Sequence, residues 1–124
     1  MHTLTGLWQS SESEILKINV TDNYAISISS MPPSEYAAKT TYAPMTARLK
    51  VLSEDTLQIQ TLNKANNLPW RNIHYRFLNN HLQWHNGQCD FLFERVSLSD
   101  LPHEAQVLLQ KQEARLRGND SGSV

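Results

Sequence analysis

The feature that most constrains the fold of this chain is a repeated alternation of apolar and polar side chains. A period of two residues is typical of strands that bury one face only. The alternation therefore predicts a mainly β, antiparallel architecture whose apolar faces share one interior. The apolar positions of this pattern are Leu16, Ile18, Val20, Tyr24, Ile26, Ile28, Leu49, Val51, Leu57, Ile59, Ile73, Tyr75, Phe77, Leu82, Trp84, Phe91 and Phe93, with Trp8 in the first strand.

Two turn sequences fix the register of the last strands. The Asn86-Gly87 dipeptide is a strong hairpin signal, and a two-residue turn there pairs Trp84 with Cys89. If Asn79-Asn80 is also a two-residue turn, Tyr75 faces Trp84. Both turns leave the apolar partners on the same face, so the segment from 70 to 96 is predicted to form a three-stranded meander.

Counting the remaining alternating segments gives eight or nine strands joined mostly by short turns, which favours an up-and-down β-barrel. The segment 35–52 is interpreted as two strands or as one bent strand interrupted at Pro44. The loops 31–34 and 63–67 are the long polar connections.

After Val96 the period changes to that of one C-terminal α-helix. The sequence predicts this helix over residues 99–117, capped by Ser99 or Asp100 and stopped at Gly118. Residues 1–118 are expected to form a single domain, and residues 119–124 a disordered tail. The helix should lay one apolar stripe on the outside or the mouth of the sheet. That stripe contains Leu101, Ala105, Leu108, Leu109 and Leu116.

Charge and cysteine content argue against several classes of function. The 124 residues carry a formal net charge of −1, which offers no broad positive field for nucleic acid. Cys89 is the only cysteine, so the sequence contains neither an intrachain disulfide nor zinc-ribbon spacing. Without an apolar run at the start we expect no membrane span and a cytoplasmic location, or a periplasmic or secreted one if an export signal has been removed.

Two short motifs resemble those of the lipocalin-like, or calycin, barrels. Gly6-Leu7-Trp8 opens the first strand, and Phe93-Glu94-Arg95-Val96 ends the last strand before the helix. In that family the arginine packs across the tryptophan ring. The resemblance implies that Trp8 and Arg95 form a cation–π contact at the closed end of the barrel, worth roughly 0.5 to 2 kcal/mol.

The barrel interior is the candidate ligand site. An eight-stranded barrel is either filled by its own side chains or holds one small ligand. In the second case the sequence predicts a non-enzymatic binding protein for a small apolar ligand, without a cofactor, in which the 31–34 and 63–67 loops gate the open end. In the first case it predicts a structural or interaction module that binds a protein partner or a second copy near Trp70 or through the helix. The predicted ligand-contacting residues are Tyr24, Tyr75, Trp84 and Phe91.

The outer face offers one weaker candidate, a pair of histidines. The predicted register sets His74 opposite His85, and such a pair could share a metal ion or titrate together. Catalytic zinc normally takes three protein ligands, and the sequence does not place His81 or Asp90 as the third. No metal site and no catalytic residue are therefore predicted. A small enzyme that uses His74 or His85 ranks last among the functional hypotheses.

Overall fold

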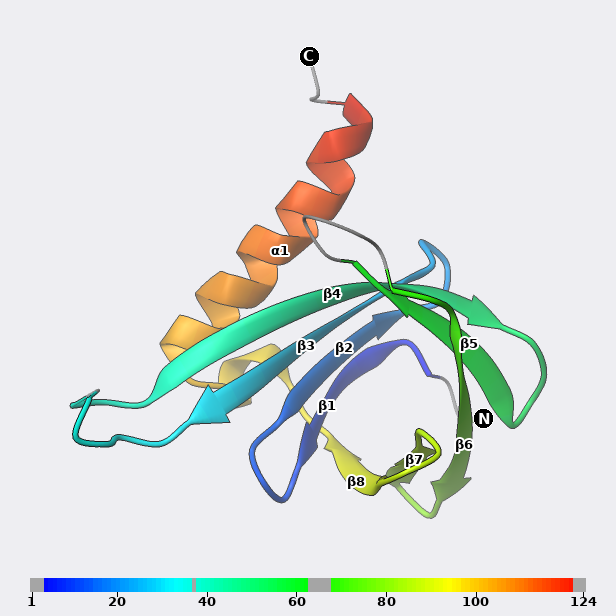
Figure 1. The fold of residues 1–124 in the computed structure, drawn as a ribbon, viewed down its shortest axis with the longest axis horizontal. Coiled ribbons are helices and arrows are strands. Elements are labelled where there is room, and N and C mark those ends of the chain that lie inside the picture. The colour runs from blue at the N-terminus through cyan, green and yellow to red at the C-terminus, as the bar shows by residue number, and fades with distance from the viewer. Residues whose placement is uncertain (1–3, 37, 63–67, 122–124) are drawn as a thin grey trace.

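The computed structural model describes residues 4–36, 38–62 and 68–121, and its eight antiparallel strands close into a barrel with one C-terminal helix (Figure 1). Each strand pairs with the next one along the chain, and the first pairs with the last. The predicted mainly β, up-and-down barrel is confirmed, with eight strands. The elements are β1 (Gly6–Ser10), β2 (Ile15–Asn19), β3 (Tyr24–Met31), β4 (Thr41–Val51), β5 (Thr56–Thr61), β6 (Arg71–Leu78), β7 (His81–His85), β8 (Asp90–Arg95), a 3₁₀ turn (Leu98–Asp100) and α1 (His103–Ser121).

The two asparagine turns differ from each other. The Asn79-Asn80 turn has the predicted register, with Tyr75 opposite Trp84, and Asn79 adopts a left-handed φ of 57°. The predicted pairing of Trp84 with Cys89 is wrong, because Trp84 lies opposite Phe91. A four-residue connection replaces the two-residue turn, and the shift of two positions leaves the apolar side chains on the predicted face.

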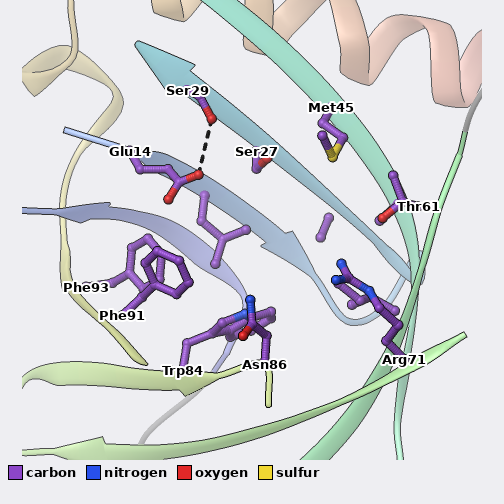
Figure 2. A pocket seen from close by; sticks show the side chains of 14 residues that line it. Glu14, Ser27, Ser29, Met45, Thr61, Arg71, Trp84, Asn86, Phe91 and Phe93 are labelled. Carbon is purple, nitrogen blue, oxygen red and sulfur yellow. Dashed lines mark hydrogen bonds between the residues drawn. The ribbon is translucent and has the colours of Figure 1, made fainter. Parts of the chain in front are cut away.

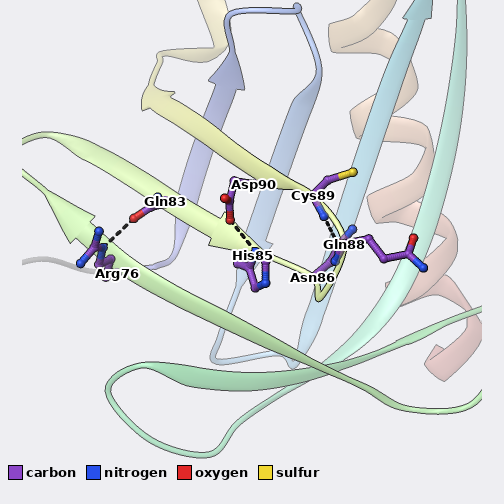
Figure 3. A network of polar contacts seen from close by, with 7 residues as sticks. All are labelled: Arg76, Gln83, His85, Asn86, Gln88, Cys89 and Asp90. Atoms are coloured by element: carbon purple, nitrogen blue, oxygen red, sulfur yellow. Dashed lines mark hydrogen bonds and ion pairs between the residues drawn. The ribbon is translucent and has the colours of Figure 1, made fainter.

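The Asn86 side chain explains the longer connection. Its Oδ1 atom accepts hydrogen bonds from the backbone N–H groups of Gln88 (3.0 Å) and Cys89 (2.9 Å), as Figure 3 shows in part. These two N–H groups therefore bond to the Asn86 side chain and not to the facing strand, which lengthens the connection. Cys89 is consequently exposed in the connection, whereas the predicted pairing with Trp84 would have placed it on the inner face.

Strand β4 is a single strand of 11 residues that contains Pro44. Pro44 lies opposite Ile28 of β3, whereas the pairing of β4 with β5 begins only at Ala47. The proline therefore occupies a stretch with a neighbouring strand on one side only, where its missing N–H group does not interrupt a ladder.

The barrel wall formed by β2 and β3 is buried on both faces. Inside the barrel, one cluster gathers Trp8, Leu16, Ile18, Ala25, Leu49 and further residues of β5 to β8. Outside it, a second cluster packs under the helix. The members of this outer cluster are Ile15, Tyr24, Ile26, Ile28, Leu101, Ala105 and Leu109, with Leu7, Tyr42, Val96, Leu108 and Leu116 at its margin.

This second cluster corrects the predicted interior. Tyr24, Ile26 and Ile28 were expected to face the barrel centre, but the register pairs Ile28 with Ile15 on the outer face. The helix supplies an apolar partner for that outer face. The alternation in β3 is therefore present, but its apolar residues face the helix and not the barrel centre. Val51 was also expected inside, and it is exposed near the end of its strand.

Helix α1 begins later and ends later than predicted. Residues 98–100 form the 3₁₀ turn, in which the Ser97 N–H group donates to Asp100 Oδ2 at 3.0 Å, and the Gln106 N–H group bonds the carbonyl of Pro102 at 3.0 Å. Gly118 continues the helix instead of ending it, and a glycine inside a helix costs only about 1 kcal/mol. Of the predicted tail, residues 119–121 belong to the helix and residues 122–124 lie outside the described part.

Polar contacts fix the helix on β2 and β3. The Tyr24 hydroxyl donates to Glu113 Oε2 at 2.5 Å, and Lys17 forms an ion pair with the same carboxylate. Helix α1 therefore crosses the outside of the barrel against β3 and β4, as Figure 1 shows. Within residues 4–36, 38–62 and 68–121, no helix combines the length and the apolar character that a membrane crossing requires.

Candidate functional site

One end of the barrel is closed by Trp8 and Arg95, which face each other across β1 and β8. The guanidinium carbon of Arg95 lies 4.2 Å from the centre of the Trp8 ring, so the cation–π contact expected from the sequence is confirmed. Arg95 Nη1 also donates to the carbonyl of Thr5 (3.2 Å), and Trp8 Nε1 donates to the carbonyl of Leu4 (3.0 Å). The indole is 1% exposed, so this end is sealed.

Tyr75 contributes to the same closed end. Its hydroxyl donates to the carbonyl of Ser53 at 2.8 Å, and its N–H group donates to the carbonyl of Asp55 at 3.0 Å. Burial, followed by the nearby charges of Asp55 and Glu54, raises the pKa of the Tyr75 phenol above its ordinary value. Tyr75 thus connects the barrel interior to the β4–β5 turn.

The other half of the barrel contains a cavity of about 210 Å³ that opens at the end where β1–β2, β3–β4, β5–β6 and β7–β8 are connected. Figure 2 shows its lining side chains from close by. The 31–34 loop follows β3 at this end, whereas the 63–67 loop lies outside the described residues, so its predicted gating role stays a prediction. The lining consists of Glu14, Leu16, Ala25, Ser27, Ser29, Met45, Ala47, Ile59, Thr61, Arg71, Trp84, Asn86, Phe91 and Phe93.

Small side chains on β3 and β4 create this space. Leu16 of β2 lies opposite Ser27, and Ala25 lies opposite Ala47, which places the small residues of β3 on the inner face. The large residues of β3 face the helix instead. If the predicted direction had been correct, Ile26 and Ile28 would have filled the volume that the cavity now occupies.

The polar groups of the cavity stand on two sides. Glu14 of the β1–β2 connection accepts a hydrogen bond from the Ser29 hydroxyl at 3.2 Å. Arg71, Thr61 and Asn86 belong to the β5–β6–β7 side, and Figure 2 shows them across the cavity from Glu14. The cavity therefore has an apolar, aromatic floor and a mouth with one acidic and one basic side.

The structure places the predicted ligand residues in three locations. Trp84 and Phe91 line the cavity. Tyr75 is inside the barrel but at the closed end, and Tyr24 is outside the barrel beneath the helix. Both tyrosine hydroxyls are already bonded within the protein, which removes them as polar contacts for a ligand in this cavity.

Sequence reasoning missed Glu14, Ser27, Ser29 and Arg71 as cavity residues. A signal existed in β3, where every second residue from Ala25 to Ser29 is small. Such a run is as compatible with a hollow inner face as with a solvated outer one. The two readings differ only in which face meets the helix.

The histidine pair on the outer face has the predicted register, with His74 opposite His85. His85 Nδ1 lies 2.5 Å from Asp90 Oδ1, so this imidazole already has a carboxylate partner (Figure 3). Hydrogen bonds from Ser53 and Thr56 lower the pKa of Asp55 near His74. In the described part of the chain, no three histidine, cysteine or acidic side chains are grouped so that they could hold a metal ion.

Comparison of the chain with models of protein families, with curated proteins and with solved structures gave no match. The class of the protein therefore rests on its own geometry, which is a closed eight-stranded antiparallel barrel with one sealed end and one cavity end.

Proposed function

We propose that this protein is a non-enzymatic, lipocalin-like binding protein that takes one small, mainly apolar ligand into the cavity at the open end of the barrel. The observation that carries the proposal is the asymmetry of the interior. The closed half is packed around Trp8, whereas Ala25, Ser27 and Ala47 leave the open half hollow. Protein interiors are normally filled to crystal-like density, so a maintained apolar space next to an opening favours a binding role.

The size of the cavity limits the ligand. An engineered apolar cavity of about 150 Å³ accommodates benzene, so the 210 Å³ found here suits a ligand somewhat larger than one aromatic ring. Trp84 and Phe91, which lie opposite each other on β7 and β8, supply aromatic surface for such a ring. The family assignment to lipocalin-like barrels rests on Trp8, Arg95 and the barrel topology, and it belongs to the same proposal.

Filling the cavity provides the test. The Ser27→Phe variant places a ring in the hollow, while Gln60→Phe adds the same ring to the outer face of β5 as a matched control. We expect wild type and Gln60→Phe to bind indole in calorimetry and Ser27→Phe to lose that binding, with unchanged circular dichroism in both variants. Failure of wild type to bind indole and a panel of single-ring compounds would contradict the proposal.

A protein-interaction role is favoured by one separate observation. Leu68 is 45% exposed and Trp70 is 39% exposed just before β6, and the Lys50 ammonium lies 5.4 Å from the Trp70 ring centre. Exposed apolar residues in sequence neighbourhood are a feature of contact surfaces. Sedimentation of wild type and Trp70→Ala tests this second candidate, which requires wild type to self-associate and the variant to be monomeric.

A further inference from the structure

We infer that the ligand of the cavity is a small apolar carboxylic acid, and that Arg71 binds its carboxylate. This inference rests on the proposed binding function and specifies the chemical class of the ligand. Arg71 is the first residue of β6 and lies opposite Ile59 of β5, which puts it on the inner face at the mouth of the cavity. Its guanidinium forms no hydrogen bond or ion pair with any residue that the structure describes, whereas its backbone belongs to the β5–β6 ladder.

A guanidinium that pairs with none of the described side chains and stands beside an apolar cavity is suited to bind an anionic group of a ligand. The guanidinium carries a permanent charge and five N–H donors in a planar fork that matches a carboxylate. Trp84 lies opposite Tyr75, which is four residues further along β6 than Arg71, and Phe91 lies opposite Trp84, so this aromatic pair of the cavity lies further from the mouth than Arg71. A ligand with an apolar body and a terminal carboxylate would therefore satisfy both regions at once.

Two further donors lie on the same side of the cavity as Arg71. Asn86 uses its Oδ1 atom for the N–H groups of Gln88 and Cys89, which leaves its Nδ2 group as the end available to the cavity. Thr61 is 7% exposed and lines the cavity one inner-face position beyond Ile59. Same-face diagonal neighbours on adjacent strands lie about 7 to 8 Å apart, so the long arginine side chain can share one carboxylate with either residue.

The opposite side of the mouth sets the orientation of the ligand. Glu14 accepts a hydrogen bond from Ser29 and faces Arg71 across the cavity (Figure 2). A carboxylate is repelled on that side and attracted on the other. The two charged residues thus disfavour an acid bound in the reverse orientation, and removal of Glu14 should strengthen the binding of an acid.

Three compounds with one apolar body test the inference by charge. Phenylpropanoate, phenylpropanamide and phenylpropylamine are titrated by calorimetry into wild type, and we expect the acid to bind best and the amine worst. In Arg71→Gln the affinity for the acid should fall by roughly tenfold while that for the amide is unchanged. In Glu14→Gln the affinity for the acid should rise by about twofold to threefold.

Controls separate this inference from the proposed function. Arg76→Gln removes an arginine from the outer face of the same strand and should bind the acid as wild type does. If the acid and the amide bind equally and Arg71→Gln changes neither, the carboxylate assignment is overturned while the cavity function stands. Preference for the amine also overturns it, because Glu14 would then be the anchor. If none of the three compounds and no indole binds, both proposals fail together.

Discussion

The guanidinium of Arg95 lies where a side chain at position 6 would be, at the closed end of the barrel, and Gly6 leaves that space open. A Cβ atom on Gly6 would overlap with Nη1 of Arg95. Gly6 also has a backbone φ of +150°, which residues with a side chain rarely adopt. The glycine two residues before Trp8 therefore makes room for the guanidinium that covers the indole. The Gly-x-Trp motif and the arginine of the last strand form one structural unit.

Gly6→Ala should lower the free energy of unfolding by about 2 to 3 kcal/mol, from backbone strain together with displacement of Arg95. Gly87→Ala is the matched control, since Gly87 also has a positive φ of +97° but an added Cβ meets nothing within 4 Å. Urea denaturation measures both variants. Equal losses would show that the clash with Arg95 is unimportant.

Arg95→Met should cost about 0.5 to 1 kcal/mol, because it keeps most of the aliphatic stem and removes the cation–π contact at an exposed position. The double variant Gly6→Ala/Arg95→Met should lose less free energy of unfolding than the two single variants lose together, since both changes disrupt the same contact. A double-mutant cycle by urea denaturation tests this, and strict additivity would separate the two residues energetically.

Tyr24→Phe should destabilise the protein by about 1.5 kcal/mol without changing ligand binding, because Tyr24 bonds Glu113 outside the barrel. Tyr42→Phe serves as the control, since Tyr42 packs at the margin of the same cluster and its hydroxyl forms no hydrogen bond with any described residue. Thermal unfolding and indole calorimetry are the two measurements. Weaker binding by Tyr24→Phe would restore the original assignment of this residue to the ligand site.

Tyr75 should make the protein sensitive to high pH. Its pKa is raised in the folded state, so the neutral phenol favours folding, and this contribution is fully present below the ordinary value of 10.0 and is lost as the pH rises through the folded pKa. Denaturation curves above pH 10 should fall more steeply for wild type than for Tyr75→Phe. At neutral pH the variant should lose about 1 kcal/mol with the hydrogen bond to Ser53. Parallel curves would show that Tyr75 titrates normally.

The Cys89 thiol should react with a thiol reagent in the folded protein at nearly the rate of the unfolded chain, since it is exposed in the β7–β8 connection. Absorbance measurements with Ellman's reagent in buffer and in urea give the two rates. A strongly protected thiol would indicate the buried position that a two-residue Asn86-Gly87 turn requires.

The sequence predicted the barrel and its register better than the candidate site, since only Trp84 and Phe91 of the predicted ligand residues line the cavity. The pairing of Tyr75 with Trp84 followed from the Asn79-Asn80 turn, and the Arg95 contact followed from the resemblance of the first and last strands. The longer connection at Asn86 could not be read from the dipeptide, because hydrogen bonds from the Asn86 side chain decide it. A shift of two residues preserves the direction of the side chains, so the apolar residues of β7 and β8 still lie on the predicted face.

By itself the sequence determined the strands, their number to within one, their closed-end contact and the helix that follows them. Only the tertiary structure decided that Tyr24, Ile26 and Ile28 lie under α1 while Ala25 and Ser27 line a hollow. The physical reason is that apolar alternation shows that one face of a strand is buried but not against what. A barrel wall covered by a helix can bury apolar side chains either in the barrel interior or under the helix. In β3 the large apolar side chains pack under α1.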